Sequence, residues 1–153
     1  ASFELLVRRT MPGYRAPFDI EDFVIVQRRR HKSNGDHLNE MLAEAMVKVR
    51  VDGEVKHTAA EGNGPVNALD LAARRALTEF YAQLADVKLV DYKVRILDSA
   101  QATAASVRVL IESTDGTRYW TTVGSSTDII EASWVALADA LEYALLPRAA
   151  AKT

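Results

Sequence analysis

Apolar and polar residues alternate along several stretches of the chain, which is the pattern of half-buried β-strands. The clearest cases are residues 44–51, where valines alternate with Lys48 and Arg50, and residues 90–96. Stretches with weaker alternation lie before and after each of these two segments. The strands expected from this pattern are 18–27, 44–51, 54–60, 90–96, 104–113 and 117–123.

Two Asp-Gly dipeptides, at 52–53 and 115–116, are strong signals for tight turns between antiparallel strands. A helical pattern follows each predicted hairpin. The first helix has Pro65 near its start, where the missing N–H costs nothing. The second opens on Asp128 and Glu131 in the manner of a capping box. The apolar positions at helical spacing are Val66, Leu69, Ala73, Ala76, Leu77, Phe80 and Leu84, then Ile130, Leu137, Ala140, Leu141 and Ala144.

The two halves of this pattern repeat each other. Residues 52–58 match 115–121 at an offset of 63, and residues 66–77 match 130–141 at an offset of 64. A small insertion is therefore expected in the second loop. Each copy is βββα. The sequence predicts an α+β fold of duplicated βββα modules, in which antiparallel strands carry helices on one face.

The ends of the chain differ from the duplicated part. Residues 1–17 combine a short apolar stretch with two prolines and a glycine, and we expect an entry arm or hinge segment there. The duplicated domain is expected at 18–146, with repeat one at about 18–85 and repeat two at about 86–146. Residues 147–153 are expected to be a frayed tail. Because the chain opens in mid-pattern, we expect it to be the C-terminal piece of a longer protein.

Composition narrows the class of protein. Of the 153 residues, 48% are hydrophobic and 26% charged, the balance of a globular domain, and no apolar run suits a membrane span. The absence of cysteine excludes disulfides, thiolate chemistry and cysteine-based zinc sites, and agrees with a cytoplasmic setting. A net charge of −2 gives no general attraction to nucleic acid. The basic run 28–32 has no interleaved aromatic residues, so we interpret it as solvated.

Catalytic signals are weak. His31 and His37 lie in a polar segment, 28–37, that we expect to be an exposed loop, and their spacing matches no standard metal motif. His57 alternates along a strand and is expected to face solvent or an interface. There is no nucleophile elbow, no P-loop, and no carboxylate pair marked out as an acid and base. We expect neither a catalytic nor a metal site.

The sharpest local feature is the turn at 62–68, GNGPVNA, between a strand and a helix. Glycines permit close approach of the backbone to a ligand, and the first N–H groups of a helix lack partners and attract anions. No acidic residue occupies this helix start, whereas the equivalent second turn has Asp128 and Glu131. From spacing alone the turn suits either a carboxylate-binding site or a plain tight β-to-α connection.

Three segments in order, GNGPVNALD at 62–70, LVDYKVRILD at 89–98 and IIEASW at 129–134, resemble the C-terminal allosteric domain shared by 2-isopropylmalate and citramalate synthases. The resemblance spans about 18–146. The opening SFELLVRR at 2–9, together with VDYKVR, looks more like the citramalate branch.

This resemblance implies a homodimer of paired βββα modules that binds a branched-chain amino acid near the dimer interface. Catalysis would belong to an N-terminal barrel, absent here, which uses a divalent metal to condense acetyl-CoA with a 2-oxo acid. No cofactor is then expected in this part of the protein. Carried over by position, the expected effector-binding residues are Gly62, Gly64, Val66 and Asn67 at the polar end, Leu89, Tyr92 and Ile96 along the wall, and Thr103, Ser125 and Thr127 completing the pocket.

Three positions depart from the pattern of this family. Ala102 stands where glycine is expected, Ser125 replaces an apolar residue and Asp128 replaces asparagine. These departures affect the size of the pocket. The functional prediction is feedback sensing of isoleucine for a citramalate synthase, with a leucine sensor, a purely structural dimerisation module and a small free-standing enzyme as alternatives.

Overall fold

The computed structural model describes residues 1–30, 40–97 and 106–147 and divides the chain into two compact units. We call Phe18–Ala82 module one, and Ala1–Pro17 together with Gln83–Thr153 module two. The predictions for His31, His37, Ala102, Thr103 and nearly all of the 147–153 tail concern residues outside these ranges. None of the helices in the described ranges is long and apolar enough to cross a membrane.

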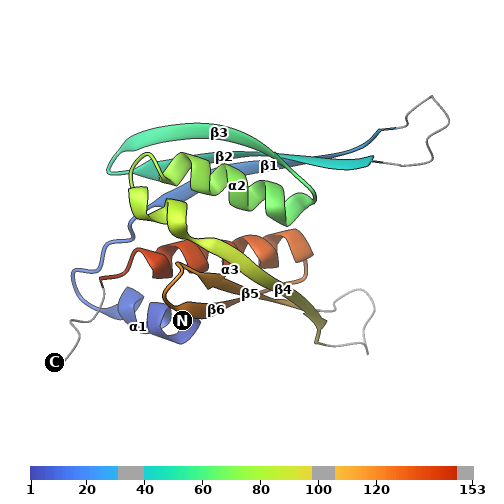
Figure 1. Cartoon of the computed structure of the whole chain (residues 1–153). Helices are drawn as coiled ribbons and strands as arrows, with labels where there is room; N and C mark the ends of the chain where they lie inside the picture. The colour runs from blue at the N-terminus through green and yellow to red at the C-terminus, as the bar shows by residue number, and fades with distance from the viewer. Residues whose placement is uncertain (31–39, 98–105, 148–153) are drawn as a thin grey trace. The chain divides into compact units, whose positions relative to one another are not determined.

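Module one is a three-stranded antiparallel sheet in the order β1-β2-β3 with helix α2 along one face (Figure 1). Alternate residues of β2, from Ala43 to Val51, are buried on the side of α2, and alanines at 68, 72, 73 and 76 form the facing stripe of the helix. Small side chains on the helix let it lie close to the sheet. The elements are β1 Asp19–Arg30, β2 Glu40–Val51, β3 Glu54–Gly62 and α2 Pro65–Leu77. The short 3-10 helix η1, Ala82–Asp86, comes next in the chain and belongs to module two except for its first residue.

Module two repeats this arrangement with the sheet order β4-β5-β6 and helix α3 (Figure 1). Val109 and Ile111 of β5 are buried beneath Ala136, Leu137 and Ala140 of the helix. A further short helix, α1, lies alongside β6 and contacts α3. The elements are α1 Ser2–Thr10, β4 Lys88–Ile96, β5 Val107–Thr114, β6 Tyr119–Ser126 and α3 Ile129–Ala144.

Equivalent hydrogen bonds confirm the predicted duplication. The Thr58 hydroxyl donates to the Ala72 carbonyl at 2.8 Å in module one, and the Thr122 hydroxyl donates to the Ala136 carbonyl at 2.6 Å in module two. Both first strands also shift register at one place, between Ile20 and Asp22 and between Leu89 and Asp91. The α+β fold of two βββα modules was therefore predicted correctly.

The register of the repeat needs one correction. Thr58 corresponds to Thr122, not to Thr121, because Thr122 is the residue that bonds the equivalent helix carbonyl. The extra residue lies in the hairpin turn: β3 starts directly after Asp52-Gly53, whereas β6 starts at Tyr119 after a longer turn. In that turn Asp115 accepts hydrogen bonds from the N–H groups of Thr117 and Arg118.

Three other expectations differ from the structure. Residues 2–10, expected as part of an arm of turns, form α1, in which Leu5 is fully buried. Strand β1 continues to Arg30, so the start of the segment expected to be a loop is strand. Helix α2 ends at Leu77, and the Thr78 hydroxyl donates a hydrogen bond to the Arg74 carbonyl there. Leu84, expected on the same helix, lies in η1 instead.

The Asp128 cap of α3 is confirmed, in modified form. Its carboxylate accepts the N–H groups of Ile130 at 2.7 Å and Glu131 at 3.1 Å. The Glu131 side chain does not return to the Asp128 N–H as in a capping box. The Ser126 hydroxyl links them, accepting from the Asp128 N–H and donating to Glu131.

We expect Asp128→Ala to lower the free energy of unfolding by about 1 kcal/mol, the usual cost of losing an N-cap. Chemical denaturation measures the change. Asp19→Ala, which removes an exposed aspartate at the start of β1, is the control and should change stability by less than about 0.5 kcal/mol. Equal losses in both variants would contradict the cap assignment.

Candidate functional site

The predicted polar end of the site lies in the β3–α2 turn of module one. A Cβ placed on Gly62 would come within 2.7 Å of the Ala68 nitrogen, so only glycine lets the end of β3 approach the first turn of α2 this closely. Gly64 is the N-cap residue, with extended backbone (φ −168°) and open space beside it. Gly62, Gly64, Val66 and Asn67, the residues expected at the polar end of the effector, therefore all lie in this turn.

This helix start lacks an internal cap. Gly64 offers no side chain, Pro65 occupies the first position and no acidic residue lies in the first turn. In the described part of the chain no hydrogen bond is recorded from the N–H groups of Val66 and Asn67 to an acceptor. The Asn67 side-chain oxygen is partly engaged, accepting the Asn63 N–H at 3.2 Å. The partial positive charge of the helix start is therefore available to an external anion.

Helix α3 shows the opposite arrangement at the equivalent place. Asp128 fills its cap position and Glu131 lies in its first turn. Those carboxylates neutralise the helix start and would repel a ligand carboxylate. The two modules thus have the same arrangement of strands and helix, but the turn before the helix carries acidic side chains only in module two.

The predicted wall lies on β4 of module two. The Tyr92 hydroxyl is 2.9 Å from the Ser133 hydroxyl, which donates to the Ile129 carbonyl at 2.7 Å. Because Ser133 has one proton and gives it to that carbonyl, Tyr92 is the donor to Ser133. Ser133 is fully buried on α3, so the bond fixes the orientation of the Tyr92 ring under the sheet.

This hydroxyl pair is particular to module two. The register of the repeat places Phe23 where module two has Tyr92, and Leu69 where it has Ser133. The fold accepts an apolar pair at these positions, so the polar pair is not needed for folding alone. Ser133 was not among the predicted site residues, although it lies within the IIEASW segment.

The remaining wall residues are less enclosed. Leu89 is half-buried, and Ile96, at the far end of β4 on the same face as Tyr92, is 71% exposed. Ser125 is exposed on β6, pointing away from α3 because its neighbours Gly124 and Ser126 face the helix. Thr127 is exposed in the β6–α3 turn. The described candidates therefore form two groups, one in each module.

A second cluster, absent from the sequence prediction, joins the N-terminal segment to α3. Arg9 donates to Asp139 at 2.7 Å and to both oxygens of Glu142, and the Tyr14 hydroxyl also donates to Glu142. Both carboxylates are largely buried. The hydrogen bond to Glu142 raises the pKa of Arg9, and burial with the same carboxylate raises the pKa of Tyr14 to about 12. We call these four residues the α1–α3 clamp.

Burial raises the pKa of the Asp139 carboxyl, and the hydrogen bond and charge of Arg9 oppose this rise. Nothing in the spacing of these four residues along the chain signals the clamp, because Arg9 and Glu142 are 133 positions apart. The only sequence signal of the clamp is the presence of two carboxylates, Asp139 and Glu142, on the inward side of a helix, where they need a partner.

A hollow of about 410 Å³ opens at the C-terminal end of α3 in module two. Arg118, at its edge, bonds Asp115 at 3.0 Å and lies over the rings of Trp120 and Tyr143. Its guanidinium is thus already engaged, and none of the predicted effector residues lines the hollow. Among the described residues no group of three histidine, cysteine or carboxylate side chains is arranged to hold a metal ion.

Comparison with known proteins decides the family. The model of the LeuA allosteric (dimerisation) domain matches residues 1–145. The chain belongs to the LeuA allosteric (dimerisation) domain family. The matched range includes α1.

Relatives of this LeuA domain are synthases that are much longer. An (R)-citramalate synthase of Geobacter sulfurreducens is 50% identical over 145 residues, 95% of this chain and 26% of the relative. One from Aquifex aeolicus is 48% identical over 147 residues, 95% of the chain and 27% of the relative. A 2-isopropylmalate synthase of the same organism is 35% identical over 108 residues, 71% of the chain and 19% of the relative.

The chain thus spans about a quarter of the citramalate synthases it matches. Similarity to the citramalate synthases is higher and covers more of the domain than similarity to the 2-isopropylmalate synthase. The predicted resemblance, including its preference for the citramalate branch, is confirmed.

Proposed function

We propose that this chain is the regulatory part of a citramalate synthase-type acyltransferase in the cytoplasm, and that it binds isoleucine as a feedback effector. The acyl transfer, between acetyl-CoA and a 2-oxo acid, belongs in this proposal to a metal-dependent barrel outside the present sequence. The chain itself contributes sensing and dimerisation.

The observation that carries the proposal is the uncapped start of α2. Two backbone N–H groups there have no acceptor among the described residues, Gly62 keeps β3 close, and Gly64 leaves open space for a ligand. A carboxylate at this place would gain the hydrogen bonds that a capping side chain normally supplies. An amino acid presents such a carboxylate.

Within module two, the wall residues of β4 are proposed to contact the branched side chain of an effector. Leu89, Tyr92 and Ile96 offer apolar surface, and the bond from Tyr92 to Ser133 holds the ring in one orientation. A pocket of mostly apolar lining with a few placed polar groups suits a small aliphatic ligand. Ser125, Thr127 and Thr103 are proposed to adjust its size.

Feedback then follows from unequal binding. An effector shifts a synthase between active and inactive arrangements only by the difference in its affinity for the two. A homodimer allows such a change to reach both subunits together, and the dimerisation domain family supports a homodimer as the assembly.

Thermal unfolding tests the proposal. Free isoleucine at about 100 times its dissociation constant should stabilise the chain by about 2.7 kcal/mol, because it binds the folded state alone. Valine and threonine, which lack part of the side chain, should give smaller shifts. A shift with leucine alone would assign the domain to a leucine-sensing synthase.

A substitution at the helix start makes the test specific. Gly64→Asp supplies a capping carboxylate, so it should raise the melting temperature of the free chain and abolish the shift with isoleucine. Gly64→Ala adds neither cap nor charge and its Cβ meets no protein atom, so it is the matched control and should reduce the response less than Gly64→Asp does. If none of the four amino acids shifts the parent chain, a structural dimerisation module is the better account.

A further inference from the structure

Helix α1 presents an apolar stripe to solvent. Phe3 is 78% exposed, Leu6 60% and Val7 40%, and Met11, just beyond the helix, is 51% exposed. On a helical wheel the first three lie within about 100° of one another, the width of a packing face. Four large exposed apolar residues within nine positions are unusual for a surface that only water contacts.

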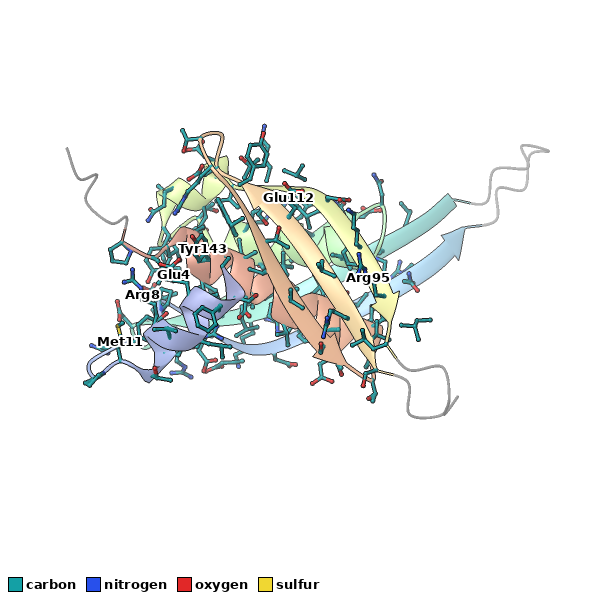
Figure 2. The ribbon with its side chains drawn as sticks, turned by 90° about the horizontal axis from the view of Figure 1, so that it is seen from below. Glu4, Arg8, Met11, Arg95, Glu112 and Tyr143 are labelled. Carbon is teal, nitrogen blue, oxygen red and sulfur yellow. The ribbon has the colours of Figure 1, made fainter. Side chains whose placement is uncertain are left out.

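The opposite side of α1 is firmly attached to module two. Leu5 is fully buried, and the Ser2 hydroxyl accepts the Val123 N–H of the edge strand β6 at 2.9 Å. Arg9 reaches the buried carboxylates of α3 through the α1–α3 clamp. Figure 2 shows Glu4 and Arg8 on the side toward Tyr143, with Met11 at the far end of the helix. The outward direction of the stripe is therefore fixed.

The clamp is an addition to the βββα unit. By the register of the repeat, Asp139 and Glu142 of α3 occupy the positions of Arg75 and Thr78 in α2. In module one Arg75 donates to the Ala59 carbonyl and Thr78 to the Arg74 carbonyl, both within the module. The βββα fold does not need two buried carboxylates here, and in module two their partners come from Arg9 and Tyr14.

We propose that α1 is a docking helix: module two binds the acyltransferase part of the synthase through the side chains of Phe3, Leu6 and Val7. The proposal rests on the proposed function in one respect: this chain must be the regulatory part of a longer enzyme. The partner surface is apolar and complementary to a single helix stripe.

The size of the stripe favours this partner over a second copy. A stable contact between separate subunits buries about 800 Å² on each side, and a few side chains of one short helix fall well short of that. A partner in the same polypeptide needs much less, because tethering raises its effective concentration to the millimolar range. The matched relatives are about four times as long as their shared domain, so such a partner exists in them.

The attachment of α1 to α3 would let a conformational change in module two reach the acyltransferase part. A helix that was loosely attached could remain bound to the acyltransferase part while module two moved, and no signal would pass. The clamp ties α1 to α3, and α3 carries Ser133, which holds Tyr92 of the candidate site. The same helix thus connects a candidate effector residue to the docking helix.

A chimaera tests the proposal. This chain replaces the matched 145 residues of the Geobacter sulfurreducens (R)-citramalate synthase, and hydrogen exchange of α1 is compared between the chimaera and the isolated chain. We expect the α1 amides to exchange at least about tenfold more slowly in the chimaera. Phe3→Ser with Leu6→Ser should abolish this extra protection. The control is Val24→Ser with Val26→Ser, two exposed apolar residues on β1, and should leave it intact.

Three outcomes are decisive. Loss of the extra protection in the stripe variant alone supports the proposal. Equal protection of α1 in chimaera and isolated chain overturns it. Protection that appears in the isolated chain and grows with its concentration also overturns it, because the partner is then a second copy.

Thermal shifts of the isolated chain with isoleucine keep the two proposals separate. A stripe variant that keeps its shift but loses the extra protection shows that sensing and docking are distinct. A chain that shows no shift contradicts the proposed effector, while the exchange experiment still reports on the docking helix.

Discussion

Replacing Gly124 with alanine is expected to cost about 3 kcal/mol of unfolding free energy, the upper end of the range for overpacking a core. A Cβ at this position would lie 2.0 Å from the Ala132 carbonyl oxygen and 3.0 Å from the Ala136 nitrogen. Both are backbone atoms of α3, so the contact cannot be relieved by turning a side chain. Strand β6 or helix α3 must move as a whole.

Chemical denaturation of the parent and variant chains measures this cost. The matched control is Gly64→Ala, whose Cβ meets no atom within 4 Å and whose backbone any residue can adopt. It should change stability by less than about 1 kcal/mol, the range of an N-cap change from glycine. Similar losses in the two variants would mean that β6 and α3 are not in backbone contact.

Replacing Arg9 with methionine should destabilise the chain by about 2 kcal/mol at pH 7. Removing one partner of a buried ion pair costs about 3–5 kcal/mol, and the partial exposure of Arg9 reduces this figure. The loss follows because Asp139 and Glu142 remain on α3 without their cation. Arg8→Met is the control: Arg8 pairs with the exposed Glu4, and its loss should cost less than about 0.5 kcal/mol.

The pH dependence of the Arg9 variant has a definite sign. Burial already raises the pKa of the Asp139 carboxyl, and Arg9 opposes the rise, so the variant should have a still higher Asp139 pKa. A carboxyl whose pKa is higher in the folded state favours folding below its unfolded pKa and loses that contribution as pH rises through the folded pKa. The difference between parent and variant should therefore shrink as the pH falls from 7 toward about 4. A difference that does not change with pH would exclude Asp139 from the clamp.

Local patterns were sufficient to predict the fold. Alternation identified β2 and β4, Asp-Gly pairs identified both hairpin turns, and the pattern after each hairpin identified α2 and α3. These signals work because each depends on neighbours a few positions away. The hairpin register was misplaced by one residue, because Thr121 and Thr122 are both threonine and only the hydrogen bond to Ala136 distinguishes them.

Helix α1 was missed for a physical reason. Its one fully buried apolar residue is Leu5, whereas Phe3, Leu6 and Val7 face outward, so the sequence pattern does not mark the side that packs on the domain. The prolines and glycine after it then suggested turns for the whole segment. The clamp was missed because its members are far apart in sequence and ordinary in type.

Only part of the candidate site could be identified from local sequence. The β3–α2 turn was singled out because glycine, proline and the lack of acidic residues are visible in a short segment. The β4 residues came from family resemblance. Ser133 could not be singled out, since a serine on a helix says nothing about which strand its hydroxyl faces.

The attachment of β6 to α3 limits how module two can respond to any signal. Trp120 donates to the Ala140 carbonyl at 3.1 Å, Thr122 donates to the Ala136 carbonyl one turn earlier, and Gly124 allows backbone contact one turn before that. Three successive rungs between one strand and one helix oppose sliding, which is the shear type of motion. Module two should therefore move as a rigid body. Its strands and helix should superimpose before and after a conformational change, and the change should lie in the segments outside them.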